Sequence, residues 1–84
     1  MKALLNREAQ KQLDRLNDPT ATRIADGIEG LECEPPEGDI KPLKGSGNAF
    51  RLRIGDYRIL YEVEDNHIKV FKIAPRGEVY RRKK

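Results

Sequence analysis

Residues 50–61 read FRLRIGDYRILY, and this stretch decides the fold. Apolar and basic side chains alternate over residues 50–54, which is the pattern of a β-strand with one buried face. Gly55 and Asp56 then suit a two-residue type II′ hairpin turn, because glycine takes the first central position without strain. Closing that turn pairs the flanking residues and fixes which side chains share a face.

The register of this predicted hairpin separates an apolar face from a basic one. The expected pairs are Ile54 with Tyr57, Arg53 with Arg58, Leu52 with Ile59, and Arg51 with Leu60. Arg51, Arg53 and Arg58 then share one face. Because like charges directly opposite each other destabilise a strand pair, Arg53 facing Arg58 indicates a functional cluster. The alternative is that each arginine pairs with a carboxylate, for which Glu62 and Asp56 are the nearby candidates.

A cluster of arginines suits a phosphodiester. The planar guanidinium group donates two parallel hydrogen bonds to phosphate oxygens. It also stabilises the extra negative charge that develops when a hydroxyl group attacks phosphorus. We therefore expect the basic face to hold a phosphodiester backbone, with RNA as the first candidate.

Two helices are expected before this hairpin. Asn6 can cap the first helix, and Asp18 followed by Pro19 is a typical start for the second. Each helix has apolar residues at i, i+4 and i+7, namely Ala9, Leu13 and Leu16 in the first and Ile24, Ile28 and Leu31 in the second. Both apolar stripes need a partner layer to cover them.

The rest of the chain completes one small domain. Residues 3–5 are a possible brief strand, residues 34–47 are rich in proline and glycine and predict a loop, and a turn at Asp65-Asn66 leads to a last strand over residues 68–73. We therefore expect an α+β fold. A short N-terminal strand and a helical hairpin would pack on a mostly antiparallel twisted β-sheet, in a single domain spanning residues 1–84.

Charge is divided unevenly along the 84 residues. Residues 1–39 carry five Lys and Arg against nine Asp and Glu, a net charge of −4, whereas residues 40–84 carry twelve against five, a net charge of +7. This asymmetry favours a polyanion bound on one side, and the alternative is ordinary solvated charge. A chain of this length is also a poor candidate for enclosing a small-molecule cofactor, so we expect an open surface site and no cofactor.

Single cysteine and histidine residues limit the other kinds of site. Cys33 is the only cysteine, so no internal disulfide framework or thiolate zinc site is expected, and no other cluster has the spacing of metal ligands. His67 is the only histidine and is interpreted as a turn residue. No apolar run is long enough for a signal peptide or a membrane span, so we expect a cytoplasmic protein.

Three stretches resemble the RelE/ParE toxin superfamily: residues 42–45 (PLKG), residues 50–61 and residues 76–80 (RGEVY). The helical hairpin before them agrees with the architecture of that family. The resemblance implies a toxin of a type II toxin-antitoxin system, inhibited by a cognate antitoxin protein. It further implies that RelE-type members cut messenger RNA on the ribosome. Their proposed chemistry is attack of the ribose 2′-hydroxyl group on the adjacent phosphate, without a metal ion.

The resemblance also assigns roles to residues. The catalytic positions of the family fall on Arg51, Arg53, Arg58, Arg76 and Tyr80, and the expected RNA-binding residues are Lys41, Lys44, Arg81 and Arg82. This sequence departs from the family pattern in two places. RNA-cutting members carry lysines where Arg51 and Arg53 stand, and many relatives place histidine where Pro75 stands. The general base is therefore unassigned. Tyr80 would orient the nucleotide, or alternatively close an edge of the core.

The first functional hypothesis is a ribosome-dependent messenger RNA endoribonuclease that inhibits translation. The alternatives are a ParE-like inhibitor of DNA gyrase and a catalytically inactive, toxin-like binding domain. The expected partners are an antitoxin and messenger RNA on the ribosome, with no membrane partner. An acidic amphipathic segment of the antitoxin would neutralise the basic face and cover exposed apolar groups such as Leu60 and Phe71.

Overall fold

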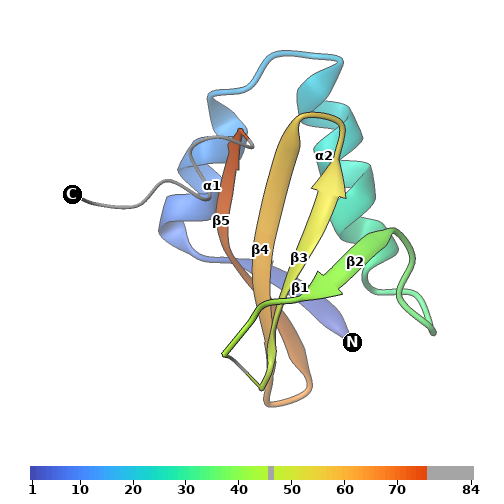
Figure 1. Cartoon of the computed structure of the whole chain (residues 1–84). Helices are drawn as coiled ribbons and strands as arrows, with labels where there is room; N and C mark the ends of the chain where they lie inside the picture. Colours follow the sequence, from blue (N-terminus) through green and yellow to red (C-terminus); the bar gives the residue numbers. More distant parts are fainter. Residues whose placement is uncertain (46, 76–84) are drawn as a thin grey trace.

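The computed structural model of the chain describes residues 1–45 and 47–75. In chain order the elements are β1 (Lys2–Leu5), α1 (Arg7–Asp14), α2 (Thr20–Gly30), β2 (Asp39–Pro42), β3 (Ala49–Ile54), β4 (Tyr57–Glu64) and β5 (His67–Pro75). Within these residues the strands form one sheet in the order β1-β5-β4-β3-β2, and only β1 and β5 run parallel. Both helices pack against one face of this sheet (Figure 1), so the predicted α+β fold is confirmed.

The predicted side-chain cap is confirmed at the start of α1, whereas the N-cap of α2 is Pro19 and Asp18 bonds to that helix from the residue before it. The Asn6 Oδ1 atom accepts a hydrogen bond from the backbone N–H of Ala9 at 2.8 Å. The Asp18 carboxylate accepts one from the backbone N–H of Thr22 at 3.1 Å. Helix α2 begins one residue later than the predicted start at Pro19, a difference within the usual uncertainty of helix ends. Among the described residues, neither helix has the length and apolar character needed to cross a membrane.

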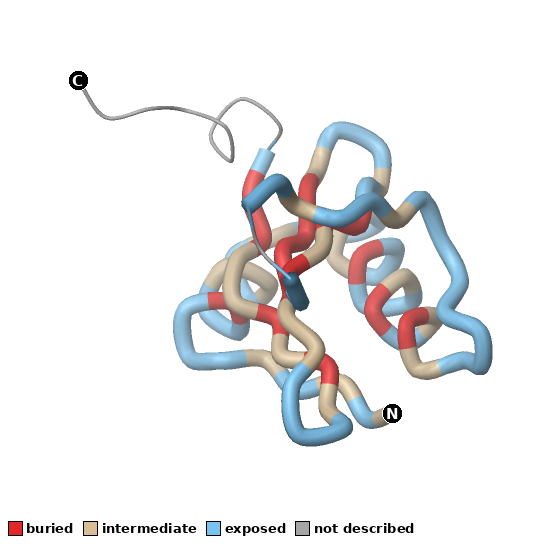
Figure 2. Tube along the Cα trace, turned by 60° about the horizontal axis from the view of Figure 1, so that its bottom comes forward, coloured by how far each residue is buried: buried red, intermediate tan, exposed pale blue. Residues whose placement is uncertain are grey.

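The core lies between the helices and the helix-covered face of the sheet. Its largest fully buried side chains are Ile24, Leu31, Leu52, Ile59, Ile68 and Val70. The predicted stripe of α2 is buried throughout, whereas Leu13 and Leu16 at the end of the first stripe are half-buried at the margin of the core. Buried positions lie on the helices and the central strands, and exposed positions lie mostly on the connecting loops (Figure 2).

The hairpin of β3 and β4 has the register that the sequence predicts. The pairs are Ile54 with Tyr57, Arg53 with Arg58, Leu52 with Ile59, and Arg51 with Leu60. Gly55 has a φ angle of +57°, a left-handed conformation that glycine adopts without a Cβ clash. The second turn also lies where it is predicted, with Asp65 and Asn66 at φ angles of 54° and 62°, as in a type I′ turn.

Residues 34–47, for which the sequence predicts a loop, contain the edge strand β2. This strand pairs antiparallel with β3, which places Asp39 beside Arg53 and Lys41 beside Arg51. The loop prediction was wrong here because three prolines and three glycines are spread through the segment. The strand is also too short to show a clear period of two.

The open face of the sheet, opposite the helices, has less exposed apolar surface than predicted. Leu60, expected to be available to a partner protein, is buried. Its cross-strand neighbours are Arg51 and Lys72, whose long aliphatic stems can cover apolar surface between them. Phe71 is half-buried and is the extra residue of a β-bulge that shifts the register between β4 and β5.

Candidate functional site

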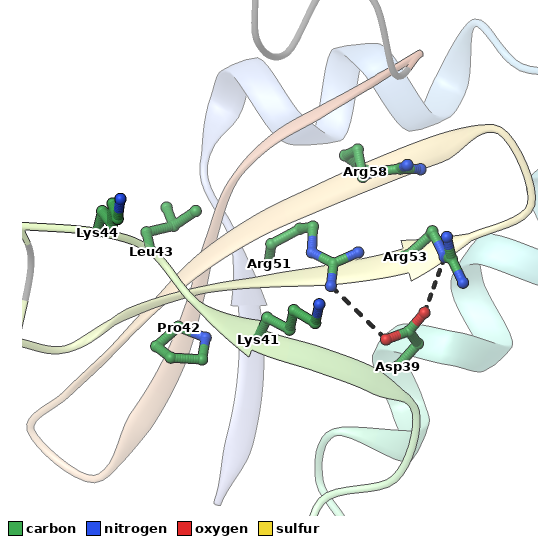
Figure 3. A pocket seen from close by; sticks show the side chains of 8 residues that line it. All are labelled: Asp39, Lys41, Pro42, Leu43, Lys44, Arg51, Arg53 and Arg58. Carbon is green, nitrogen blue, oxygen red and sulfur yellow. Dashed lines mark ion pairs between the residues drawn. The ribbon is translucent and has the colours of Figure 1, made fainter.

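Three arginines come together on the open face. Arg51 and Arg53 lie two residues apart on β3, so both point to the same side of the sheet, and Arg58 on β4 pairs directly with Arg53. Figure 3 shows the three side chains beside one another over the central strands. The clustering predicted from the hairpin register is therefore present in the structure.

These arginines line an open pocket of about 600 Å³, called here the basic pocket. Its lining residues are Asp39, Lys41, Pro42, Leu43, Lys44, Arg51, Arg53 and Arg58. Lys41 lies on β2, and Lys44 follows that strand at the far end of the pocket from Asp39 (Figure 3). The lining thus contains five cationic side chains and one carboxylate, and the pocket favours an anion.

Asp39 is the residue that the sequence analysis missed. Its Oδ2 atom lies 2.8 Å from the Nε atom of Arg53, and its Oδ1 atom lies 3.6 Å from a terminal guanidinium nitrogen of Arg51 (Figure 3). The expected carboxylate candidates were wrong, since neither Glu62 nor Asp56 forms an ion pair with these arginines among the described residues. The sequence carried one weak signal, because Ile40 stands between two charged residues as in a strand with alternating faces.

Arg58 differs from its two neighbours because it is deeply buried without a carboxylate partner. It is only 5% exposed, and its Nη1 atom donates a hydrogen bond to the Tyr57 carbonyl oxygen at 3.3 Å. Its Nε atom is buried and has no hydrogen-bond partner among the described residues, and none of their carboxylates lies within 4.0 Å of its guanidinium group. A buried charge without a counter-charge is costly, so this group favours an anion that reaches it from the pocket.

The other predicted site residues are not among those that the structure describes. Arg76, Tyr80, Arg81 and Arg82 fall outside the described residues. His67 lies at the start of β5, away from the basic pocket, and its Nδ1 atom is 2.8 Å from the Asp65 carbonyl oxygen across the turn. Within residues 1–45 and 47–75, no three His, Cys, Asp or Glu side chains form a group that could hold a metal ion.

The chemistry available in the basic pocket is charge stabilisation. Guanidinium groups donate hydrogen bonds and keep their positive charge, so they can hold a phosphate and offset negative charge that develops on it. They accept protons poorly, so the three arginines do not supply a general base. Burial raises the pKa of Tyr61, which lies on the helix-covered face and therefore does not contribute to the pocket.

Comparison with known proteins identifies the family of this chain. Residues 3–80 match the family described as the ParE toxin of the type II toxin-antitoxin system, parDE. A curated relative, putative toxin RelE1 of Methanocaldococcus jannaschii, is 33% identical over 82 residues, which covers 92% of this chain and 91% of the relative.

Two solved structures of archaeal complexes resemble the whole fold. The RelB-RelE antitoxin-toxin complex from Methanococcus jannaschii contains a chain that matches with a TM-score of 0.78 and 29% identity, covering 92% of this chain and 94% of that one. The RelE-RelB complex from Pyrococcus horikoshii OT3 matches with a TM-score of 0.75 and 34% identity, covering 90% of this chain and 94% of that one. The similarity therefore extends over nearly the entire length in each case.

Proposed function

Because this chain belongs to the ParE toxin family, within the RelE/ParE superfamily, we propose that it is a ribosome-dependent endoribonuclease that cuts messenger RNA. The chain is a RelE-like toxin of a type II toxin-antitoxin system. The proposal concerns its target and its chemistry. We propose that residues 1–84 form a single toxin domain that acts in the cytoplasm.

The observation that carries this function is the state of Arg58. Its guanidinium group is buried beside two further arginines, and among the described residues it has no carboxylate partner. A phosphodiester has one negative charge and two unesterified oxygens, which match the paired donors of a guanidinium group. An RNA backbone entering the basic pocket would therefore supply the counter-charge that no described residue gives to Arg58.

The proposed reaction needs no metal ion. The 2′-oxygen of a ribose attacks the adjacent phosphorus, the bond from phosphorus to the 5′-oxygen breaks, and the products carry a 2′,3′-cyclic phosphate and a 5′-hydroxyl group. The 2′-hydroxyl proton leaves to a base, which stays unassigned, and the 5′-oxygen gains a proton. In this scheme Arg51, Arg53 and Arg58 stabilise the additional negative charge on phosphorus oxygens in the transition state.

Further predicted residues would complete the site. Arg76 would join the phosphate contacts and Tyr80 would orient the nucleotide, for which stacking on a base is the physical reason. Lys41 and Lys44, at the wall of the basic pocket, would contact the phosphates on either side of the cleaved bond, together with Arg81 and Arg82.

We also propose a cognate antitoxin as the partner that keeps this toxin inactive. The two archaeal structures are complexes of RelE with RelB, and a chain of each matches this fold over nearly its whole length. An acidic segment would be attracted to the basic pocket, and its apolar residues would cover the half-buried Phe71.

The test compares two variants that each remove one cation from the open face. Arg58→Met removes the buried charge in the basic pocket that has no carboxylate partner in the described part of the chain. Lys69→Met removes a charge outside the pocket that is already paired with Glu64 at 3.4 Å. After induction in cells, transcript ends are mapped and tested for 2′,3′-cyclic phosphates. Loss of one preorganised donor should reduce cleavage about 10²- to 10³-fold in Arg58→Met. Lys69→Met should cleave like the wild-type protein.

Three results would count against the proposed function or its assigned site. The first is equal transcript cleavage by the wild-type protein and Arg58→Met, which would remove Arg58 from the chemistry. The second is growth arrest without transcript cleavage but with gyrase-trapped DNA breaks, which would favour a gyrase inhibitor. An Arg58→Met and Tyr80→Phe double variant that still arrests growth fully would also count against the assigned site.

A further inference from the structure

We propose that Asp39 is a built-in competitor for the substrate phosphate, so that its carboxylate lowers the affinity of the basic pocket for RNA. This role rests on the proposed function of the pocket as an RNA-phosphate site. It assigns to Asp39 a part in substrate affinity rather than in the cleavage step itself.

The geometry of Asp39 is that of a shared counter-ion. One carboxylate oxygen approaches Arg53 at 2.8 Å and the other approaches Arg51 at 3.6 Å, so a single side chain engages two of the three guanidinium groups (Figure 3). A phosphodiester presents two oxygens in a similar arrangement and requires the same donors. Carboxylate and phosphate therefore compete for Arg51 and Arg53.

The position of Asp39 makes this competition reversible. Strand β2 is an edge strand of the sheet. The side chain of Asp39 is 41% exposed and that of Arg53 is 53% exposed. Ion pairs with this degree of exposure contribute little to folding, because water screens both charges. An incoming phosphate can therefore take the place of the carboxylate, whereas Arg58 lies deeper and has no such internal partner among the described residues.

The salt dependence of RNA binding distinguishes competition from mere positioning. The logarithm of the binding constant falls with the logarithm of salt concentration by about 0.7 for each neutralised phosphate of a single strand. Asp39→Asn keeps a neutral hydrogen-bond acceptor near Arg53 but frees one cation. If Asp39 competes, the salt slope steepens by about 0.7, and binding at 0.1 M salt strengthens about fivefold.

The experiment uses the full-length chain and a 2′-O-methyl oligoribonucleotide of about ten nucleotides, which binds but lacks the attacking hydroxyl group. Binding is measured from 50 mM to 400 mM salt for the wild-type protein, Asp39→Asn and Glu64→Gln. Glu64 is the matched control because it is an exposed acid on β4 that pairs with Lys69 outside the basic pocket. Asp39→Ser, with a shorter side chain, checks the result if Asp39→Asn folds poorly.

The expected result is tighter binding and a steeper slope in both Asp39 variants, with less than about a twofold change in Glu64→Gln. Equal or weaker binding with an unchanged slope in the Asp39 variants would overturn competition and assign Asp39 a positioning role. Arg58→Met is measured in parallel. If wild-type binding does not depend on Arg58, the proposed RNA site fails, and the role of Asp39 fails with it.

Discussion

The two faces of the same β-sheet follow opposite rules of burial. On the helix-covered face, the buried side chains are aliphatic or aromatic, as in the row of Leu52, Ile59 and Ile73. On the open face, Arg51 and Arg58 are buried almost as deeply. Burying apolar surface stabilises a fold, whereas burying an unpaired charge destabilises it. The helix-covered face thus accounts for stability, and the open face is organised for an anion at the expense of stability.

The largest expected change in stability comes from a substitution on the helix-covered face. Ile59 is 0% exposed, so Ile59→Ala removes buried methyl groups and leaves a cavity in a core that relaxes only in part. We expect a loss of about 2–5 kcal/mol in the free energy of unfolding, measured by denaturant titration. A loss below about 1 kcal/mol would mean that this face is packed loosely, and the contrast between the faces would weaken.

Substitution of Arg58, the residue before Ile59 on β4, should change the free energy of unfolding in the opposite direction. Arg58→Met keeps an unbranched side chain but removes a buried charge that pairs with no carboxylate among residues 1–45 and 47–75. The free energy of unfolding should stay constant or rise by about 1–2 kcal/mol, in the same titration. A fall of more than about 2 kcal/mol would show that the Arg58 guanidinium group stabilises the fold, and the proposed division between the faces would be wrong.

A third variant tests whether burial, rather than charge, makes the difference. Lys69 also lies on the open face, but its side chain is 42% exposed. Its Nζ atom lies 3.4 Å from a carboxylate oxygen of Glu64 and 3.9 Å from one of Asp65. Because such exposed ion pairs contribute little, Lys69→Met should change the free energy of unfolding by no more than about 1 kcal/mol. A change as large as that of Ile59→Ala would contradict this interpretation.

The sequence predicted the β3–β4 hairpin well because its information is local. A two-residue turn and strict alternation fix the register, and the register places Arg51, Arg53 and Arg58 on one face. The position of Asp39 could not be predicted in the same way. Its partners lie 12 and 14 residues further along the chain, and only the pairing of β2 with β3 brings them together.

Depth of burial was equally hard to predict from the sequence. Alternation assigns Leu60 to the open face, yet this residue is buried because it lies on a central strand between long neighbouring side chains. Arg58 and Arg53 also differ in burial, although the two residues are a cross-strand pair. Strand position does not explain this difference, because Arg51 lies on β3 with Arg53 and is buried.

The smallest change in stability near neutral pH is expected for substitution of Tyr61. This residue lies on the helix-covered face and stacks on Phe50 at a ring-centroid distance of 5.5 Å. Burial raises the pKa of the Tyr61 phenol above the ordinary value of 10.0. Below pH 10 the phenol is neutral in both states, so its contribution to stability is fully present. Above pH 10 it ionises first in the unfolded chain, and this contribution is lost as the pH rises through the folded-state pKa.

Tyr61→Phe should therefore flatten the decline in stability above pH 10, because phenylalanine has no proton to lose. The measurement is the free energy of unfolding between pH 8 and pH 11, with Tyr57→Phe as the matched control for loss of a phenol. An unchanged decline in Tyr61→Phe would assign the alkaline instability to other groups. A flatter curve would instead show that the helix-covered face also disfavours charge, as expected of a surface that excludes water, and that buried charge is confined to the open face.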